Sequence, residues 1–418
     1  MGPADAQLEA RRQAEKAARE SYGRLVAQLA TRTGDIAAAE DALADAFETA
    51  LRTWPERGVP QSPEAWLWTT ARRNIGHRHR HSAVQTAALQ NLLDQYDERN
   101  DFQGGISTSA GDWSTVDARL KLLFVCAHPA IDPGIRTPLM LQTVLGLDAV
   151  RIGSAFLVAP ATMGQRLVRA KSKIKLAGLG FEIPGTSELP ERLHDVLQAV
   201  YSAFGTGWDD PVSAVGAGLT EEAIFLGRLL VTLLPQEPET WGLLSLMLHC
   251  EARRGARRDS DGNFVPLQKQ DPKHWNFEYV TEAEKGLRHA ATMGRFGRFQ
   301  CEAAIQSVHA QRAMTGETNA EALRVLYDIL WHLAPTVGVA VSRAAALHDV
   351  GDVEAALHIL DALPETDTAG YQPWWVTRSR VAESLGDREG ARKSLERGIG
   401  LTEDPAVRAW LTERLMSL

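Results

Sequence analysis

The chain has 418 residues, of which 44% are hydrophobic, and its formal net charge is −8. This composition excludes a fibrous or wholly disordered protein, and the length predicts a globular one of about two to four domains. Three widely separated cysteines without CxxC spacing indicate neither a disulfide framework nor a zinc site. The N-terminus lacks the apolar core of a secretory signal, and no apolar run reaches the roughly 18 residues of a membrane helix, so we expect a cytoplasmic protein.

The charge is unevenly distributed along the chain. Residues 1–175 hold 22 Lys and Arg against 19 Asp and Glu, a net charge of +3, whereas residues 176–418 hold 23 against 34, a net charge of −11. Only the first part has a charge that favours DNA, so we expect any DNA-binding surface there.

Residues 35–54 are predicted to form an amphipathic helix. Its apolar residues recur at helical spacing: Ile36, Leu43, Phe47, Ala50, Leu51 and Trp54. Four acids fall away from that stripe: Glu40, Asp41, Asp45 and Glu48. An acidic face would repel DNA, so its natural partner is a basic protein surface. The alternative interpretation is a solvated helix face.

Residues 63–81 are predicted to form a basic helix, because Ala65 to His81 contains four Arg, three His and no acid. Two tryptophans, Trp66 and Trp68, precede its first arginines. Rings next to cations can stack on unpaired bases while Arg contacts the backbone of single-stranded DNA. Packing in the core is the alternative, and for Trp66 we favour it.

Residues 137–175 read as a helix, a short helix, a turn and a longer helix that begins at Pro160. An apolar stripe is formed by Met163, Leu167, Ala170 and Ile174. The opposite face is expected to carry Thr162, Gln165, Arg166, Arg169, Lys171, Lys173 and Lys175. Polar groups near the start and cations further on are typical of a helix-turn-helix recognition helix. An ordinary basic surface helix is the alternative.

The second half of the chain is predicted to consist of helix pairs. The segment VGDVEAALHIL at 350–360 is echoed by LGDREGARKSL at 385–395, a period of 35 residues. This is close to the tetratricopeptide value of about 34, so we expect a helical repeat array. Coincidence between similar helices is the alternative. Gly and Pro at 178–190 indicate a domain boundary, and the polar, Gly-rich stretch at 91–115 indicates a flexible linker.

The order of these parts resembles the extracytoplasmic-function (group IV) sigma-70-type factors of bacterial RNA polymerase. Four segments carry the resemblance: GDIAAAEDALADAFETAL (34–51), AWLWTTARR (65–73), LFVCAHPAID (123–132) and AFLVAPATMGQRLVRAKSKI (155–174). The segments at 188–204, 222–249 and 261–276 are similar to the subgroup with a tetratricopeptide-like C-terminal extension.

This resemblance implies roles for particular residues and two partners, RNA polymerase core (the beta-prime clamp and beta flap) and promoter DNA. Asp41, Asp45 and Phe47 would dock on the clamp. The −10 element would be read by Arg72, Arg73, Asn74, Arg78 and Arg80. The −35 element would be read by Thr162, Gln165, Arg166 and Arg169, and we expect Lys173 to contact phosphates.

The sequence departs from the family pattern at several positions. Gly76 and His79 stand where apolar residues are usual, and His77 stands where Asp is usual. Arg151 and Gly153 replace the usual Glu and Ala of the first helix of the helix-turn-helix. These changes leave the implied roles in place.

Signals for an enzyme are poor, and we expect neither catalysis nor a cofactor. The segment DSDGN (259–263) has its glycine at the wrong position for a calcium loop, so we interpret it as a turn. His77 and His81 alternate with arginines that would oppose a metal ion, so no metal site is predicted. The sequence holds no GxSxG, HExxH or phosphate-binding Gly-Lys loop.

Together these features predict an all-α protein with four parts: region 2 at 17–84, a linker at 85–115, region 4 at 116–182 and a regulatory TPR-like array at 183–418. The array could bind a protein or a small molecule. The expected function is that of a sigma factor. A stand-alone helix-turn-helix regulator with a sensing array, and a helical adaptor without DNA binding, are the alternatives.

Overall fold

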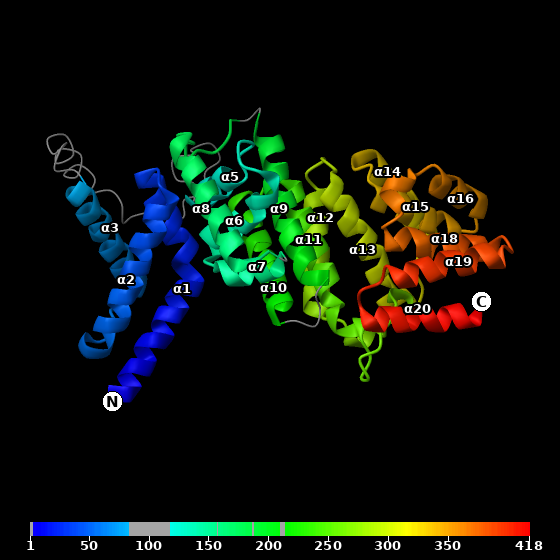
Figure 1. The fold of residues 1–418 in the computed structure, drawn as a ribbon, viewed down its shortest axis with the longest axis horizontal. Helices are drawn as coiled ribbons and strands as arrows, with labels where there is room; N and C mark the ends of the chain where they lie inside the picture. Colours follow the sequence, from blue (N-terminus) through cyan, green and yellow to red (C-terminus); the bar gives the residue numbers. More distant parts are fainter. Residues whose placement is uncertain (1–2, 83–117, 157, 186–187, 210–213) are drawn as a thin grey trace. The chain divides into compact units, whose positions relative to one another are not determined.

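The computed structural model describes residues 3–82, 118–156, 158–185, 188–209 and 214–418, and the regular elements within them are helices (Figure 1). The only strand-like feature in these ranges is an isolated antiparallel bridge between Arg258 and Phe264. The predicted all-α class is therefore confirmed. The linker predicted at 85–115 lies outside the described residues. In the described part of the chain, no helix combines the length and apolar character needed to cross a membrane.

The chain divides into two compact units, Met1–Ala223 and Ile224–Leu418. The N-terminal unit contains α1 (Pro3–Thr33), α2 (Ile36–Arg57), α3 (Pro63–Ser82), α5 (Ala118–Cys126), α6 (Pro133–Leu145), α7 (Ala149–Ala155), α8 (Pro160–Leu176) and α9 (Leu189–Asp209). Helix α10 (Ala214–Leu233) crosses the boundary between the units. Within the N-terminal unit α1 contacts α2, α3, α5 and α6.

Helix α2 begins where the sequence predicts. Gly34 adopts a positive φ of 66°, and the Asp35 carboxylate caps α2 by accepting the Ala38 N–H. Most of the predicted apolar stripe is buried, namely Ile36, Leu43, Ala50 and Trp54. Phe47 is only half-buried, and Leu51 is 49% exposed because it lies about 100° around the helix from Ala50.

Helices α1 and α6 approach unusually closely. A Cβ on Gly23 of α1 would lie 2.0 Å from the carbonyl oxygen of Val144 on α6. Next to it Gly146, which ends α6 with a φ of 70°, lies against the ring of Tyr22. Because any larger residue at position 23 would push the helices apart, this contact depends on glycine.

Short local signals define where helices α6, α7 and α8 begin and turn. Asp132 caps α6, and Asp148 accepts the N–H groups of Val150 and Arg151 at the start of α7. Gly153 explains one departure from the family pattern, because a Cβ there would lie 2.6 Å from the Val158 carbonyl oxygen. The turn into α8 therefore excludes the usual alanine.

Helix α9 lies beyond the boundary predicted near residue 182, yet it packs on α5 and α6 within the N-terminal unit. The Thr137 hydroxyl on α6 donates to the Ala199 carbonyl oxygen at 3.2 Å. Arg136 pairs with Asp195 at 2.9 Å. The buried face of α9 includes Val196, Leu197 and Val200.

The C-terminal unit is built of successive helix pairs (Figure 1). They are α11 (Pro238–Ala252), α12 (Phe277–Ala291), α13 (Arg298–Thr315), α14 (Ala320–Leu333), α15 (Val337–Asp349), α16 (Val353–Asp361), α17 (Glu365–Thr368), α18 (Gln372–Ser384), α19 (Arg388–Gly400) and α20 (Pro405–Ser417). Short 3-10 turns lie between α11 and α12. The DSDGN segment there is a turn, as predicted, in which Asp259 accepts the N–H groups of Asp261 and Asn263.

The two echoed segments occupy equivalent positions in this unit. Gly351 and Gly386 have φ values of 88° and 81°. Asp352 caps α16 and Asp387 caps α19. Four buried side chains follow the same spacing, Ala356 and Leu360 in α16 and Ala391 and Leu395 in α19. The echo therefore marks a repeated helix–turn–helix unit, while a complete tetratricopeptide array stays a prediction.

The Gly153→Ala variant tests the turn before α8. The added methyl must displace the Val158 carbonyl, so we expect a loss of about 1–3 kcal/mol in the free energy of unfolding. Thermal or denaturant unfolding followed by circular dichroism measures it. Gly164→Ala is the matched control, because its nearest neighbour, the Ala149 Cβ, is 3.9 Å away. That change should raise stability by about 0.5–1 kcal/mol, and equal effects of both variants would contradict the argument.

Candidate nucleic-acid interface

Helix α8 presents the polar face that its sequence predicts. Its apolar stripe is buried, comprising Met163, Leu167, Ala170 and Ile174. The five predicted DNA-contacting side chains of this helix are all exposed: Thr162, Gln165, Arg166, Arg169 and Lys173. Three cations and two hydrogen-bonding groups on one surface can contact phosphates and base edges.

Lys171 corrects the sequence interpretation of this helix. It was expected on the polar face with the other lysines, but its side chain is only 8% exposed. Its Nζ lies 2.5 Å from Glu40 Oε2 on α2 and 2.9 Å from Gln142 Oε1 on α6. Position 171 follows Leu167 by four residues, so it lies at the edge of the buried stripe rather than opposite it.

A second ion pair joins the same two helices. Lys175 Nζ lies 2.7 Å from Asp35 Oδ2, and the Lys175 side chain is 62% exposed. Burial alone would raise the pKa of Asp35, but its hydrogen bonds with Lys175 and with the Ala38 N–H outweigh burial and lower it. Burial raises the pKa of Glu40 despite the opposing charge of Lys171. The pairing with Lys171 therefore compensates only part of the cost of desolvating Glu40.

Helix α3 holds its aromatic and basic residues in two different environments. Trp66 is half-buried and packs edge-to-face on the buried Trp54, with ring centroids 5.5 Å apart. The Arg72 guanidinium lies 5.2 Å from the centre of the Trp68 ring. Arg73 is exposed.

The remaining predicted residues of α3 are placed differently. Asn74 directs its Nδ2 to the Ala42 carbonyl oxygen of α2 at 3.4 Å, so it ties α3 to α2. Arg78 and Arg80 belong to α3, but their side chains lie outside the described residues.

The predicted polymerase-binding residues share the middle of α2. Asp41 is exposed, and Asp45 and Phe47 are half-buried. Asp41 and Asp45 are four residues apart and therefore lie on one face. This face begins beside Glu40, the partner of Lys171, so the acidic surface and the contact with α8 are adjacent on one helix.

Sequence reasoning missed four residues that join these parts: Gly23, Glu40 as an ion-pair partner, Gln142 and Lys171. Of these four, only the burial of Lys171 could have been predicted from the sequence, because its spacing from Met163 and Leu167 matches the apolar stripe. The others act through contacts with distant segments, which helical periodicity does not report.

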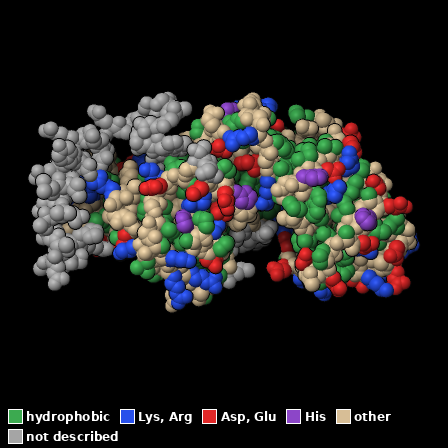
Figure 2. All heavy atoms as spheres, turned by 90° about the horizontal axis from the view of Figure 1, so that it is seen from above, with side chains coloured by type: hydrophobic (Ala, Val, Ile, Leu, Met, Phe, Trp, Pro, Cys, Tyr) green, Lys and Arg blue, Asp and Glu red, His purple; other side chains and the backbone are tan. Residues whose placement is uncertain are grey.

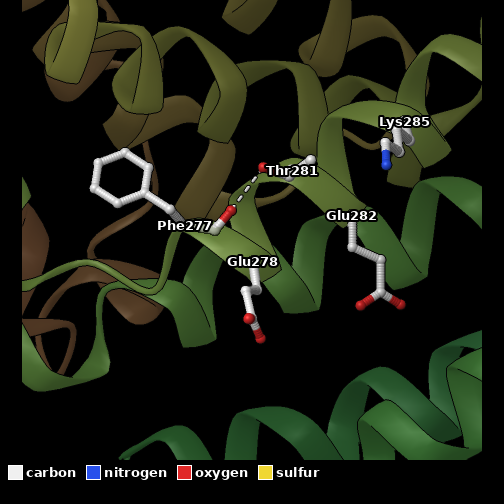
Figure 3. Close-up of a pocket in the computed structure, with 5 residues that line it drawn as sticks. All are labelled: Phe277, Glu278, Thr281, Glu282 and Lys285. Carbon is white, nitrogen blue, oxygen red and sulfur yellow. Dashed lines mark hydrogen bonds between the residues drawn. The ribbon is translucent and has the colours of Figure 1, made fainter.

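The C-terminal unit offers no comparable collection of functional groups in the part that the structure describes. Figure 2 shows acidic and basic side chains interspersed on the face drawn, and several are paired, as in Arg324–Asp328 and Arg380–Asp349. A hollow of about 480 Å³ on α12 is lined by Phe277, Glu278, Thr281, Glu282 and Lys285 (Figure 3). These side chains come from one helix and fan outward, so they do not converge on a ligand. Among the described residues no group of His, Cys, Asp and Glu could hold a metal ion.

Comparison with known protein families identifies two regions of the chain. Residues 18–83 match sigma-70 region 2, which covers the C-terminal half of α1 and all of α2 and α3. Residues 192–291 match a family of unknown function, DUF6596, which extends from α9 to the end of α12. No solved structure was found to match the chain.

An uncharacterized protein of Rhizobium meliloti (strain 1021) is 34% identical over 384 residues, which cover 90% of this chain and 89% of that protein. The similarity therefore extends over both units and not over region 2 alone. The chain belongs to the same family as this rhizobial protein, and its N-terminal region 2 makes it a protein of the sigma-70 type.

Proposed function

We propose that this protein is a sigma factor of the extracytoplasmic-function type that directs RNA polymerase core to specific promoters. The observation that carries the proposal is the match of α1–α3 to sigma-70 region 2 in a chain that also displays an exposed polar and basic face on α8. A sigma factor needs both a polymerase-binding region and a surface that reads DNA. It performs no catalysis of its own, acts in the cytoplasm and lends specificity to the polymerase.

In this proposal α8 enters the major groove at the −35 element. Gln165 and Arg166 lie on the exposed face in the first turns of α8, where side chains of a recognition helix reach base edges. Lys173 lies nearer the C-terminal end and would contact phosphates. The three helices α6–α8 with the tight turn at Gly153 support this assignment as region 4.

Helices α2 and α3 take the other two roles. The exposed Arg73 and the Trp68–Arg72 pair would contact the −10 element, because a ring beside a cation suits unpaired bases and their backbone. Arg78 and Arg80 are assigned the same role on sequence alone. The acidic face at Asp41 and Asp45, with Phe47 next to it, would dock on a basic surface of the polymerase clamp.

The C-terminal extension is proposed to regulate these regions. Its first helix, α9, already packs on α5 and α6 of the DNA-binding part through Thr137, Arg136 and Asp195. An extension attached in this way can influence region 4 directly, and its remaining surface could receive a protein or small-molecule signal.

Run-off transcription with core polymerase and the gene's own upstream region tests the function. If the protein is a sigma factor, it binds core tightly, and core produces a discrete transcript only when the protein is present. A stand-alone helix-turn-helix regulator would bind that DNA without core and would not start transcription. The second result would contradict the proposal.

Substitutions in α8 test how DNA is read. Arg166→Ala should cost about 1–3 kcal/mol at the matched −35 position and relax the preference there, because a base contact is lost. Lys173→Ala should weaken all promoters alike and reduce the salt dependence of binding, because a phosphate contact is lost. Holoenzyme binding to a panel of −35 variants at several salt concentrations measures both. If Arg166→Ala and Lys173→Ala lose the same binding affinity on every −35 variant, α8 does not read sequence.

Reversing the charges of Asp41 and Asp45 to Lys tests the docking face. Two cations should repel a basic clamp surface, so we expect loss of core binding with unchanged helicity. Co-purification with core in moderate salt measures the binding. Glu56→Lys, an exposed acid in the last turn of the same helix, is the control and should bind core normally. A double variant that co-purifies at the wild-type yield would exclude this face.

A further inference from the structure

The contact between α11 and α13 in the C-terminal unit holds a buried arginine without an acidic partner. Arg253, at the C-terminal end of α11, is only 8% exposed. Its Nε donates to the His249 carbonyl oxygen at 3.3 Å, its Nη2 donates to Gln306 Oε1 on α13, and its guanidinium also hydrogen-bonds the Cys250 thiol. All three partners are neutral. A buried charge is costly when no opposite charge compensates it.

A second arginine, Arg312 on α13, has a similar environment. Its guanidinium donates to the carbonyl oxygens of Gln268, Leu267 and Gln270, at 2.6, 3.0 and 2.7 Å, in the segment between α11 and α12. It also lies 5.5 Å from the centre of the Trp275 ring. Carbonyl oxygens and an aromatic ring supply partial negative charge, which offsets only part of a full positive charge.

The acids around these two arginines are already engaged elsewhere. Three of them belong to other ion pairs: Glu251–Arg254 at 2.8 Å, Glu302–Arg298 at 2.6 Å and Asp349–Arg380 at 2.6 Å. A fourth, Glu284 on α12, accepts the Ser307 hydroxyl and lies 3.4 Å from His249 Nε2. Among the residues that the structure describes, neither Arg253 nor Arg312 forms an ion pair.

His309 shows that the charges of the two arginines act at one place. It lies on α13, three residues before Arg312, and is half-buried. Burial and the charges of Arg253 and Arg312 lower its pKa to about 4, against the opposing charge of Asp349. Burial and the Arg253 charge likewise lower the pKa of His249 to about 3. Both imidazoles are therefore neutral at neutral pH, and the positive potential comes from the arginines.

We propose that the contact between α11 and α13 is a binding site for a small molecule with a phosphate or carboxylate group, held by Arg253 and Arg312 with His309 as a further hydrogen-bonding group. A guanidinium presents paired N–H groups that match the oxygens of either anion. The bound anion supplies the negative charge that the chain itself lacks there. The site lies inside the C-terminal unit, away from the surface charges of that unit.

Gln306 occupies the place of the anion in the ligand-free chain. Its amide oxygen is a neutral acceptor for Arg253, and its side chain is half-buried. A charged oxygen binds a guanidinium more strongly than an amide oxygen does, so an entering anion can displace Gln306. Ligand binding needs no sigma-factor activity. Only its use as a signal for the C-terminal extension rests on the function proposed above.

Equilibrium dialysis of the full-length chain with radiolabelled sulfate tests the site. Sulfate resembles phosphate but keeps the same charge near neutral pH, and chloride holds the ionic strength constant. We expect saturable binding, with slower amide hydrogen exchange around Arg253 and Arg312 when sulfate is present. Competition by inorganic phosphate and by citrate identifies the ligand class. Displacement at a lower concentration of phosphate indicates a phosphate-bearing ligand, and the reverse order indicates a carboxylate-bearing one.

Two substitutions identify the residues that hold the anion. Arg253→Gln removes the buried charge and should weaken sulfate binding by about tenfold or more, because a charge-assisted contact is lost. Gln306→Glu places a carboxylate beside Arg253 and should abolish binding while it keeps the arginine. Arg392→Gln is the control and should bind sulfate normally, because Arg392 lies on α19 with its side chain 61% exposed. Circular dichroism measures the helical content of each variant.

Sulfate should bind more tightly as the pH falls from about 7.5 to about 6. A bound dianion raises the pKa of His309, so the protein takes up a proton on binding. The charged groups that face His309 are Arg253, Arg312 and Asp349, and side chains of these types do not titrate in this range. Tyr327 on α14, near Arg253, has its pKa raised to about 12 by burial. His309→Gln should therefore bind sulfate with no such pH dependence.

Several results would overturn the site. They are the absence of saturable binding, equal binding by the wild type, Arg253→Gln and Gln306→Glu, and slower exchange confined to α8, whose exposed cations would then hold an adventitious ion only. If Arg253→Gln loses its helical content, Gln306→Glu decides, because it leaves the arginine in place. The assay contains no polymerase. Its failure therefore leaves the sigma-factor function untouched, and a failure of run-off transcription leaves the anion site untouched.

Discussion

The burial of Lys171 against Glu40 ties α8 to α2, beside the packing of α1 on α5 and α6, and so sets where α8 lies in the N-terminal unit. Helix α8 must bury one face and present cations on the other, and a lysine at the edge between these faces can do either. By pairing with α2, it fixes α8 beside the helix that carries Asp41 and Asp45. The cations Arg166, Arg169 and Lys173 of α8 stay exposed, while the contact with region 2 holds the opposite side of the helix.

A charged residue at this point has consequences that an apolar one would not have. Leu or Met at 171 would pack against α6 in any register, whereas Lys171 requires a carboxylate and an amide oxygen at defined places. Such a contact gives specificity more than stability. It also responds to charge, so the basic partner proposed for α2 would act on the same groups that hold α8. The charge of that partner would have little effect on an apolar contact at this position.

How much the sequence predicted depended on the range of the interactions. Local features were predictable from helical spacing and capping residues. They include the apolar stripes of α2 and α8, the turn at Asp259 and the equivalent glycines at 351 and 386. Lys171 was placed on the wrong face because periodicity treated its charge as a sign of exposure. Its partner Glu40 lies 131 residues earlier in the chain, and no local pattern links the two. The backbone contacts of Asn74 and Gly23 escaped for the same reason.

Helix α6 connects the Glu40–Lys171–Gln142 cluster to the C-terminal extension. Arg136 and Thr137 near its start contact α9, and Gln142, about 7.5 Å further along its axis, contacts Lys171. A single helix of 13 residues therefore holds the extension at one end and the charged cluster at the other. Any shift of α9 along α6 must move Arg136 and Thr137 or break their contacts with α9. Because a short helix moves as one body, Gln142 would move with them, and the extension would act on the Glu40–Lys171–Gln142 cluster without reaching the exposed polar face of α8.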